Sequence, residues 1–315
     1  MLKKIFIWLA RLALGFVIFN AVGFAILYKG DTPLEILKKK YASHNASAFM
    51  PLQGMQVHYR DQGDQRPDTP IVLLHGLSSS LLTWDSCAMF LKPHRTIRVD
   101  LPGFGLTGPN ASGDYSVEYY VTFLHEFLAK LEVKQCYLVG SSLGGHIAWK
   151  YALAYPKEVK KLILIDAAGY PLHDIPTLGL RLARMPMAKA LMTVINPKPV
   201  VKASLEDIYA DDNKVTPRLI DQYCDMLLRP GNRQALRTRL SITQKFDTLS
   251  VRQVKVKTLI IWGSGDKLIP RSYAAKFERD LPDSKSVMVS GVGHVPMEES
   301  PEETAGHIID FIEEK

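Results

Sequence analysis

Residues Tyr137–His146 of this 315-residue chain, Tyr-Leu-Val-Gly-Ser-Ser-Leu-Gly-Gly-His, give the clearest indication of its fold. Its first residues continue a short apolar run that is typical of a buried parallel strand, and the residues after it have a helical pattern. Gly140 and Gly144 flank Ser142 as Gly-x-Ser-x-Gly, which predicts a sharp turn from strand to helix. Small flanking residues let strand and helix approach closely enough to expose the serine hydroxyl. Ser142 is therefore a candidate nucleophile, although a glycine-rich connection without a catalytic role would give the same short pattern.

The composition is that of a folded globular protein. Hydrophobic residues make up 47% of the chain, enough for one large α/β domain with an insertion or for two small domains. The formal net charge is +7, but no nucleic-acid-binding motif accompanies it, so we expect no nucleic-acid partner. Three scattered cysteines have no metal-ligand spacing, so the sequence predicts neither a disulfide framework nor a metal site: Cys87, Cys136 and Cys224.

The segment Ile5–Tyr28 is predicted to be a single-pass membrane anchor. Two of its 24 residues are strongly polar, Arg11 and Asn20. As a helix it would span roughly 36 Å, against about 30 Å for the hydrocarbon core of a bilayer. The alternative is a signal peptide cut near residues 21–23, which would make the protein secreted or periplasmic. We favour the anchor because the apolar run continues past that position. Basic residues at both ends leave the orientation open.

Short apolar runs alternate with helical patterns from about residue 49 to the end of the chain. The strands are expected at 55–61, 71–74, 96–99, 136–139, 161–165, 258–262 and 286–289. Helical patterns occur at 116–131, at 143–155 and near the end, at 301–314. This alternation predicts an α/β fold with a mostly parallel, doubly wound sheet that is covered by helices on both faces.

The region 170–246 interrupts this alternation and is predicted to be a helical lid. It contains helical patterns at 177–195, 200–210, 216–228 and 234–245 and no strand pattern. Inserted between two strands, such helices would cover the carboxyl ends of the sheet, where open α/β sheets bind ligands. Apolar residues and methionines crowd the part from 176 to 195, beyond what one buried stripe needs, which suits a pocket for acyl chains. The predicted organisation is an anchor (1–30), a polar linker (31–48), a core (49–169 and 247–315) and the lid (170–246).

Two residues at other strand ends would complete a catalytic triad with Ser142. A serine hydroxyl needs a base to remove its proton, and a histidine base needs a carboxylate to fix its tautomer. Asp266 and His294 each lie in a glycine-bearing loop directly after a predicted strand. The chain order of serine, acid and histidine is the order associated with this kind of turn. Asp166 also ends a predicted strand and is the alternative to Asp266 for the acid.

Acyl transfer also needs hydrogen-bond donors where the carbonyl oxygen becomes negative. The backbone amide of Leu143 is one candidate, because it follows the nucleophile at the start of a helix, where the dipole favours an anion. The second candidate is the amide of Leu77, in the loop after the predicted strand at 71–74. His75 and Gly76 would shape that loop.

From about residue 49 to its end the chain resembles the serine α/β-hydrolases. The motifs that carry the resemblance occur in the family's order: His75-Gly76, Asp100-Leu-Pro-Gly-Phe-Gly, Gly140-Ser-Ser-Leu-Gly-Gly, Trp262-Gly-Ser-Gly-Asp266 and Gly293-His294-Val-Pro-Met-Glu. The serine distinguishes the chain from the family's dehalogenases and epoxide hydrolases, which carry an aspartate at that turn. Within the family, residues 162–169 and the apolar N-terminal segment are most similar to bacterial lipases of the cold-adapted type and to membrane-anchored monoacylglycerol lipases.

The resemblance implies a membrane-anchored serine hydrolase that cleaves carboxylic esters, with acylglycerols as candidate substrates. Such an enzyme uses an acyl-enzyme route with Ser142, Asp266 and His294 and needs no metal or organic cofactor. Other activities of the same scaffold remain alternatives, namely those of a thioesterase, a peptidase or a carbon–carbon bond hydrolase. A non-catalytic ligand-binding protein is a further alternative. The sequence leaves the oligomeric state open.

Overall fold

Eight strands form one sheet in the order β1-β2-β4-β3-β5-β6-β7-β8. The computed structural model describes residues 6–9, 11–12, 14–16, 27–43, 46–64, 69–171, 185, 193–242 and 248–314. The strands are β1 (Ser47–Leu52), β2 (Met55–Gln62), β3 (Ile71–Leu74), β4 (Thr96–Val99), β5 (Cys136–Ser141), β6 (Val159–Ile165), β7 (Thr258–Gly263) and β8 (Ser284–Val289). Strand β2 runs antiparallel to both of its neighbours, and the remaining pairs are parallel. The predicted mostly parallel sheet is therefore confirmed.

The central strand β3 is apolar along its whole length because both of its faces are covered. In β3, Val72 and Leu74 belong to one buried cluster, whereas Ile71 and Leu73 belong to the cluster on the other face. Successive side chains of a strand point to opposite faces, so a strand buried on both sides tends to be a continuous apolar run. The edge strand β8 has several exposed residues.

Helices cover both faces of this sheet. The described helices are α2 (Leu34–Tyr41), α3 (Asp85–Phe90), α4 (Val117–Lys130), α5 (Leu143–Ala154), α8 (Lys198–Ile208), α9 (Pro217–Leu228), α10 (Asn232–Ser241), α11 (Ser272–Asp280), α12 (Pro296–Glu299) and α13 (Pro301–Glu313). Buried residues of α4, α5 and α11 form one cluster with the sheet, and those of α3 and α13 form the other. This is the doubly wound arrangement expected from the sequence.

The region 31–48 differs from the polar linker expected from its composition. It contains α2 and the first residues of β1. Leu37 is 1% exposed and packs with residues of the core and of α9. Lys40 and Tyr41 both donate hydrogen bonds to Asp225 of α9, each over 2.7 Å. The composition of this region did not predict a packed helix, because α2 buries only a narrow apolar stripe and most of its lysine side chains face solvent.

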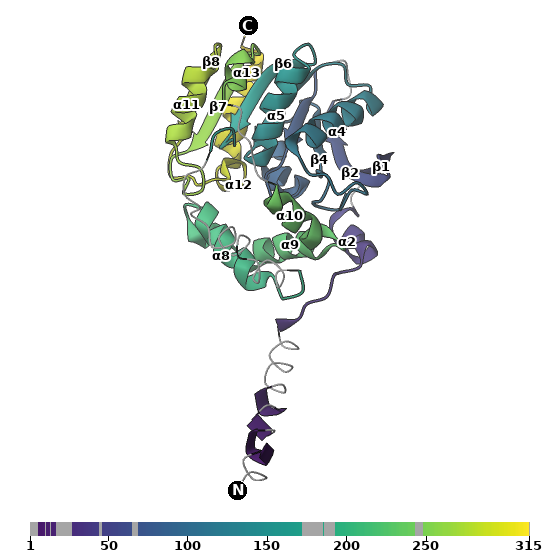
Figure 1. The fold of residues 1–315 in the computed structure, drawn as a ribbon. Coiled ribbons are helices and arrows are strands. Elements are labelled where there is room, and N and C mark those ends of the chain that lie inside the picture. Colours follow the sequence, from purple (N-terminus) through teal and green to yellow (C-terminus); the bar gives the residue numbers. More distant parts are fainter. Residues whose placement is uncertain are drawn as a thin grey trace.

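The inserted helices, by which we mean α8, α9 and α10, lie between β6 and β7 in the sequence. Figure 1 shows them together on one side of the core, and the described pieces between residues 6 and 16 lie beyond them on that same side. Segments 27–32 and 194–196 are tied together, since Lys29 N donates to the carbonyl of Val194 over 2.9 Å and Asn196 N donates to that of Leu27 over 2.7 Å. Most of the helix expected at 177–195 lies outside the described residues.

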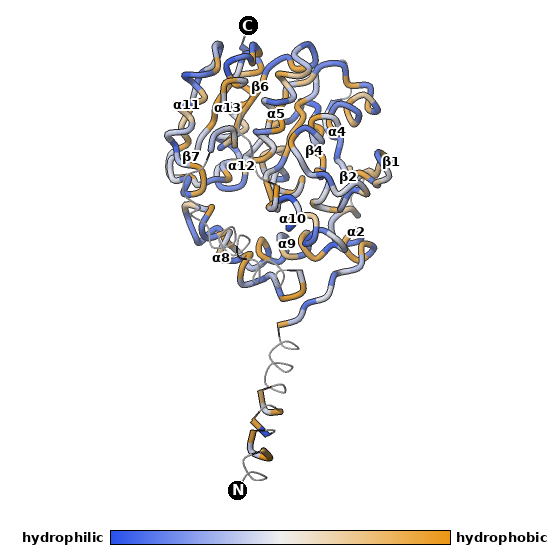
Figure 2. The backbone as a smooth tube through the Cα atoms, viewed as in Figure 1, coloured by the Kyte–Doolittle hydropathy of each residue, from blue (hydrophilic) through white to orange (hydrophobic). Residues whose placement is uncertain are grey.

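The predicted membrane span at 5–28 also lies mostly outside the described residues. Its described pieces between residues 6 and 16 are helical, and Phe6, Trp8 and Phe16 are 73%, 65% and 71% exposed. Figure 2 shows hydrophobic colouring on much of these pieces. Within the described parts of the chain, no helix combines the length and the apolar character that crossing a membrane requires.

Candidate active site

Ser142 lies on the turn between β5 and α5 in a strained backbone conformation, with φ 53° and ψ −113°. A residue other than glycine in such a region costs about 1–3 kcal/mol. Two backbone hydrogen bonds hold it there, one from Ser142 N to the carbonyl of Ile165 and one from Ala168 N to the carbonyl of Ser142, both 3.0 Å long. The loop after β6 therefore supports the turn after β5.

The glycines around Ser142 are required by close backbone packing. A Cβ atom at Gly140 would lie 2.2 Å from the carbonyl oxygen of Gly144, and a Cβ atom at Gly144 would lie 2.4 Å from that of Leu74. Both distances are shorter than any real carbon–oxygen contact, so a side chain would push α5 away from the sheet. This is the packing that the Gly-x-Ser-x-Gly pattern predicts.

Asp266 lies in the loop after β7 and His294 in the loop after β8, and their side chains are in contact. His294 Nδ1 donates a hydrogen bond to Asp266 Oδ2 over 2.7 Å, and the two side chains are 5% and 0% exposed. The other carboxylate oxygen, Oδ1, accepts bonds from the amides of Leu268 and Ile269 at 2.7 and 3.0 Å. His294 Nε2 is buried and forms no hydrogen bond with the described residues. The side chain of Asp266 thus orients an imidazole that keeps one nitrogen available as a base.

The loops that carry these two residues are in direct contact. A Cβ atom at Gly263, where β7 ends, would lie 1.9 Å from the carbonyl oxygen of Gly293. Gly293 immediately precedes His294, so the absence of a side chain at Gly263 lets the histidine loop approach Asp266.

The loop after β3 lies against Ser142. A Cβ atom at Gly76 would be 3.2 Å from Ser142 Cβ and 3.8 Å from its Oγ. His75 holds this loop, because its Nδ1 donates to the Gly76 carbonyl over 2.8 Å and its Nε2 accepts from Leu101 N over 3.0 Å. Burial lowers the pKa of His75, so its imidazole is neutral and structural. The amide of Leu77 belongs to the same loop, as expected.

Asp100 is the first residue of the Asp-Leu-Pro-Gly-Phe-Gly motif, and no individual role was predicted for it from the sequence. Asp100 is 1% exposed, and its carboxylate accepts hydrogen bonds from Leu81 N, Leu106 N and His58 Nδ1 at 2.7, 2.8 and 2.7 Å. It therefore joins the loops after β3 and β4. The signal in the sequence is an acidic residue directly after a buried strand, which requires partners.

Asp166, the alternative acid, lies beside the Asp266–His294 pair. The ligand atoms of the three residues are all within 4.8 Å of one another, a spacing that would also fit a cation, but the Asp266–His294 hydrogen bond accounts for two of the three. Asp166 Oδ1 accepts a bond from Gly263 N over 2.9 Å. Burial, reinforced by the charge of Asp266, raises the pKa of Asp166 well above its ordinary value. The raised pKa favours the protonated form of Asp166.

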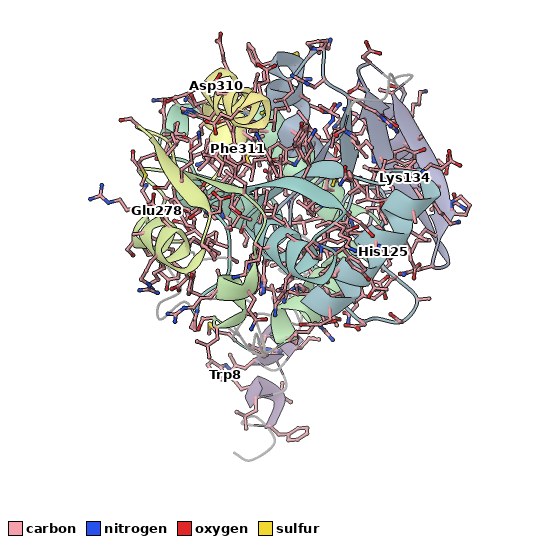
Figure 3. The ribbon with its side chains drawn as sticks, turned by 90° about the horizontal axis from the view of Figure 1, so that it is seen from above. Trp8, His125, Lys134, Glu278, Asp310 and Phe311 are labelled. Carbon is pink, nitrogen blue, oxygen red and sulfur yellow. The ribbon has the colours of Figure 1, made fainter. Side chains whose placement is uncertain are left out.

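A separate hollow of about 790 Å³ lies at α4. Figure 3 labels two of its residues, His125 and Lys134. Its lining includes none of the candidate site residues and consists of His125, Ala129, Glu132, Val133, Lys134 and Glu158.

Comparison with known proteins identifies the family. Residues 69–301 match the alpha/beta hydrolase fold family, and the chain belongs to it. It is 29% identical over 269 residues to Lipase 1 of Psychrobacter immobilis, covering 82% of this chain and 81% of that protein. It is also 29% identical over 283 residues to monoacylglycerol lipase ABHD6 of Homo sapiens, covering 82% of each chain.

Solved structures agree with this assignment. The structure titled as a membrane phospholipase A and bacterial virulence factor matches with a TM-score of 0.73 and 25% identity, covering 96% of this chain and 98% of that one. The named relatives support ester hydrolysis as the activity at the level of the family.

Proposed function

We propose that this protein is a membrane-anchored serine hydrolase that cleaves carboxylic esters of lipids, with Ser142, Asp266 and His294 as its catalytic triad. The observation that carries the proposal is the buried 2.7 Å hydrogen bond between Asp266 and His294 Nδ1, in a site whose serine lies on the strained turn at the end of β5. This pairing leaves Nε2 of the histidine as the base.

In the proposed reaction, His294 Nε2 removes the proton of the Ser142 hydroxyl while Oγ forms a bond to the ester carbonyl carbon. The amides of Leu77 and Leu143 donate hydrogen bonds to the resulting oxyanion. When the intermediate collapses, the bond to the alcohol oxygen breaks and the histidine returns its proton to that oxygen. Water then attacks the acyl-enzyme with the same base and releases the carboxylic acid and the free serine.

Acylglycerols are the proposed substrate class because the relatives include proteins named as a lipase and as a monoacylglycerol lipase. The anchor over residues 5–28 is proposed from the length of the apolar run and from the exposed aromatic side chains of its described pieces. Transfer of exposed apolar side chains from water into a lipid phase lowers the free energy of the system. The proposed lid over residues 170–246 would close on the acyl chain.

The proposal is tested by active-site labelling. A fluorophosphonate probe should label the full-length protein at Ser142, whereas Ser142→Ala should remain unlabelled. Absence of labelling in the folded wild-type protein would favour the non-catalytic alternative. A panel of oxygen esters, thioesters and peptides of matched acyl groups then separates the activities: the fastest turnover should be on oxygen esters, and preference for another class would reassign the activity.

A further inference from the structure

Glu298, four residues after His294, binds hydroxyl groups from three other parts of the fold. Its carboxylate accepts hydrogen bonds from Thr83 in the 3₁₀ turn Leu81–Trp84, from Tyr209 at the end of α8, and from Tyr223 in α9. The bond from Tyr223 is 2.6 Å long. Figure 1 shows α12, which carries Glu298, at the end of the core that faces the inserted helices.

Two further bonds connect the inserted helices α9 and α8 to the candidate active site. Ser79, two residues after Leu77, donates a hydrogen bond to the Tyr223 hydroxyl over 3.5 Å. The backbone amide of His294 donates to the carbonyl of Ile208, the last residue of α8, over 2.7 Å. The inserted helices therefore contact both the loop of the proposed oxyanion hole and the backbone of the proposed base.

The neighbouring Glu299 reinforces the second connection. Its Oε1 accepts a bond from Gly293 N over 2.6 Å, and its Oε2 accepts one from Ala210 N over 3.0 Å. Both donors are main-chain amides. Gly293 lies in the loop that carries His294, and Ala210 lies shortly after the end of α8. Glu299 thus fixes the loop of His294 to the end of α8, whereas Glu298 joins two donors of the inserted helices, Tyr209 and Tyr223, to Thr83 of the core.

The protonation states agree with this arrangement. Burial, followed by the charge of Glu298, raises the pKa of Tyr209 and of Tyr223, so both phenols keep their protons and donate. Burial also raises the pKa of Glu298. A buried carboxyl group is costly without its donors. Displacement of α8 would remove the donor Tyr209, and displacement of α9 would remove Tyr223, so the packing of each helix on the core and its bond to Glu298 form or break together.

We propose that Glu298 is a positioning residue. It couples the packing of the inserted helices on the core to the placement of His294 and of the loop containing Leu77. This inference rests on the proposed function, because it requires His294 to act as the base. The inserted helices would thereby contribute to the catalytic step itself, in addition to any contact with the acyl chain.

The test compares Glu298→Gln, Tyr223→Phe and the double variant in the full-length protein with a soluble short-chain ester. Titration with a fluorophosphonate probe counts the functional sites, so that kcat is expressed per titrated site. Glutamine retains the shape of the side chain but has one acceptor oxygen in place of two. We expect kcat per site to fall roughly tenfold to a hundredfold in Glu298→Gln, with KM changed by less than about threefold.

The double variant should be no slower than Glu298→Gln alone, because the hydroxyl of Tyr223 acts through the carboxylate. Glu302→Gln is the matched control, since Glu302 is exposed on the neighbouring helix α13, and it should behave as the wild type. Should Glu298→Gln fail to fold, Tyr223→Phe alone decides, because it removes only a hydroxyl and should still lower kcat per site several-fold.

Wild-type kcat per titrated site in a folded Glu298→Gln or Tyr223→Phe variant would overturn the inference, even if the melting temperature fell. Multiplying losses in the double variant would also overturn it. Ser142→Ala separates the two proposals. If that variant stays active, the proposed function fails; if it is inactive while Glu298→Gln is unaffected, only the role of Glu298 fails.

Discussion

The imidazole of His294 and the carboxylate of Asp266 form a buried hydrogen bond of 2.7 Å through Nδ1 and Oδ2. Because the carboxylate occupies Nδ1, the neutral ring carries its proton there and keeps its lone pair on Nε2. A lone pair held at a fixed position is what a general base requires.

Removing the proposed nucleophile should abolish ester hydrolysis. Ser142→Ala is expected to lower kcat/KM by roughly 10⁴-fold or more, because only the oxyanion donors and substrate binding would remain. Circular dichroism and thermal unfolding should show a retained fold, since alanine fits the space of serine. A loss of less than about tenfold in a folded variant would remove Ser142 from the mechanism.

The two neighbouring carboxyl groups should respond differently to the same change. Asp266→Asn should lower kcat by roughly 10⁴-fold, because an amide at this position favours the wrong tautomer of His294. Asp166→Asn should be mild, because an amide resembles the protonated acid and can still accept from Gly263 N. Parallel kinetics on one ester measure both effects. A severe loss for the Asp166 variant and a mild one for the Asp266 variant would reverse the assignment.

Asp166 should also make the stability of the protein depend on pH. Its folded-state pKa is raised by burial and by Asp266, so its contribution to stability is fully present below the unfolded-state pKa of about 3.9 and declines as the pH rises towards the folded-state value. Asp166→Asn lacks this titration. The free energy of unfolding of the variant relative to the wild type should therefore increase from about pH 4 upwards, as measured by urea unfolding at several pH values. A difference that does not change with pH would contradict this expectation.

The N-terminal segment should control membrane attachment. Full-length protein should stay with membranes through an alkaline carbonate wash, because its long apolar run enters the hydrocarbon core. A variant that starts at Leu27 keeps the pairing of Leu27 and Lys29 with residues 194–196, and it should be released and still hydrolyse a soluble ester. If the native protein instead begins near Phe24 and is found free of membranes, the signal-peptide alternative is correct.

Chain-length preference should reveal the proposed acyl pocket. Each buried methylene contributes about 0.8 kcal/mol, so kcat/KM on p-nitrophenyl esters should rise from two carbons to roughly six to ten and then level off. The apolar stretch 176–195 that motivates this prediction lies mostly outside the described residues. An optimum at acetate would contradict an acyl channel and indicate a small polar or aromatic substrate.

The features that sequence alone determined are local ones. The turn at Ser142 follows from Gly140 and Gly144, whose missing side chains are needed within one strand, turn and helix. Strand β3 is a continuous apolar run because both faces of the parallel sheet are buried there. A serine, an acid and a histidine at the ends of such strands must share one edge of the sheet, so the candidate triad could be predicted before any distance was known.

Tertiary structure decided the relationships between residues far apart in the chain. Asp166 and Asp266 both follow buried strands, and only the packing of the loops brought His294 Nδ1 to Asp266. The helix at Leu34–Tyr41 looked like a linker because its partner, α9, lies about 180 residues away. The hydroxyl donors to Glu298 come from three separate segments. Hydrogen bonds and packing act at contact distance, and sequence spacing does not specify which distant groups come into contact.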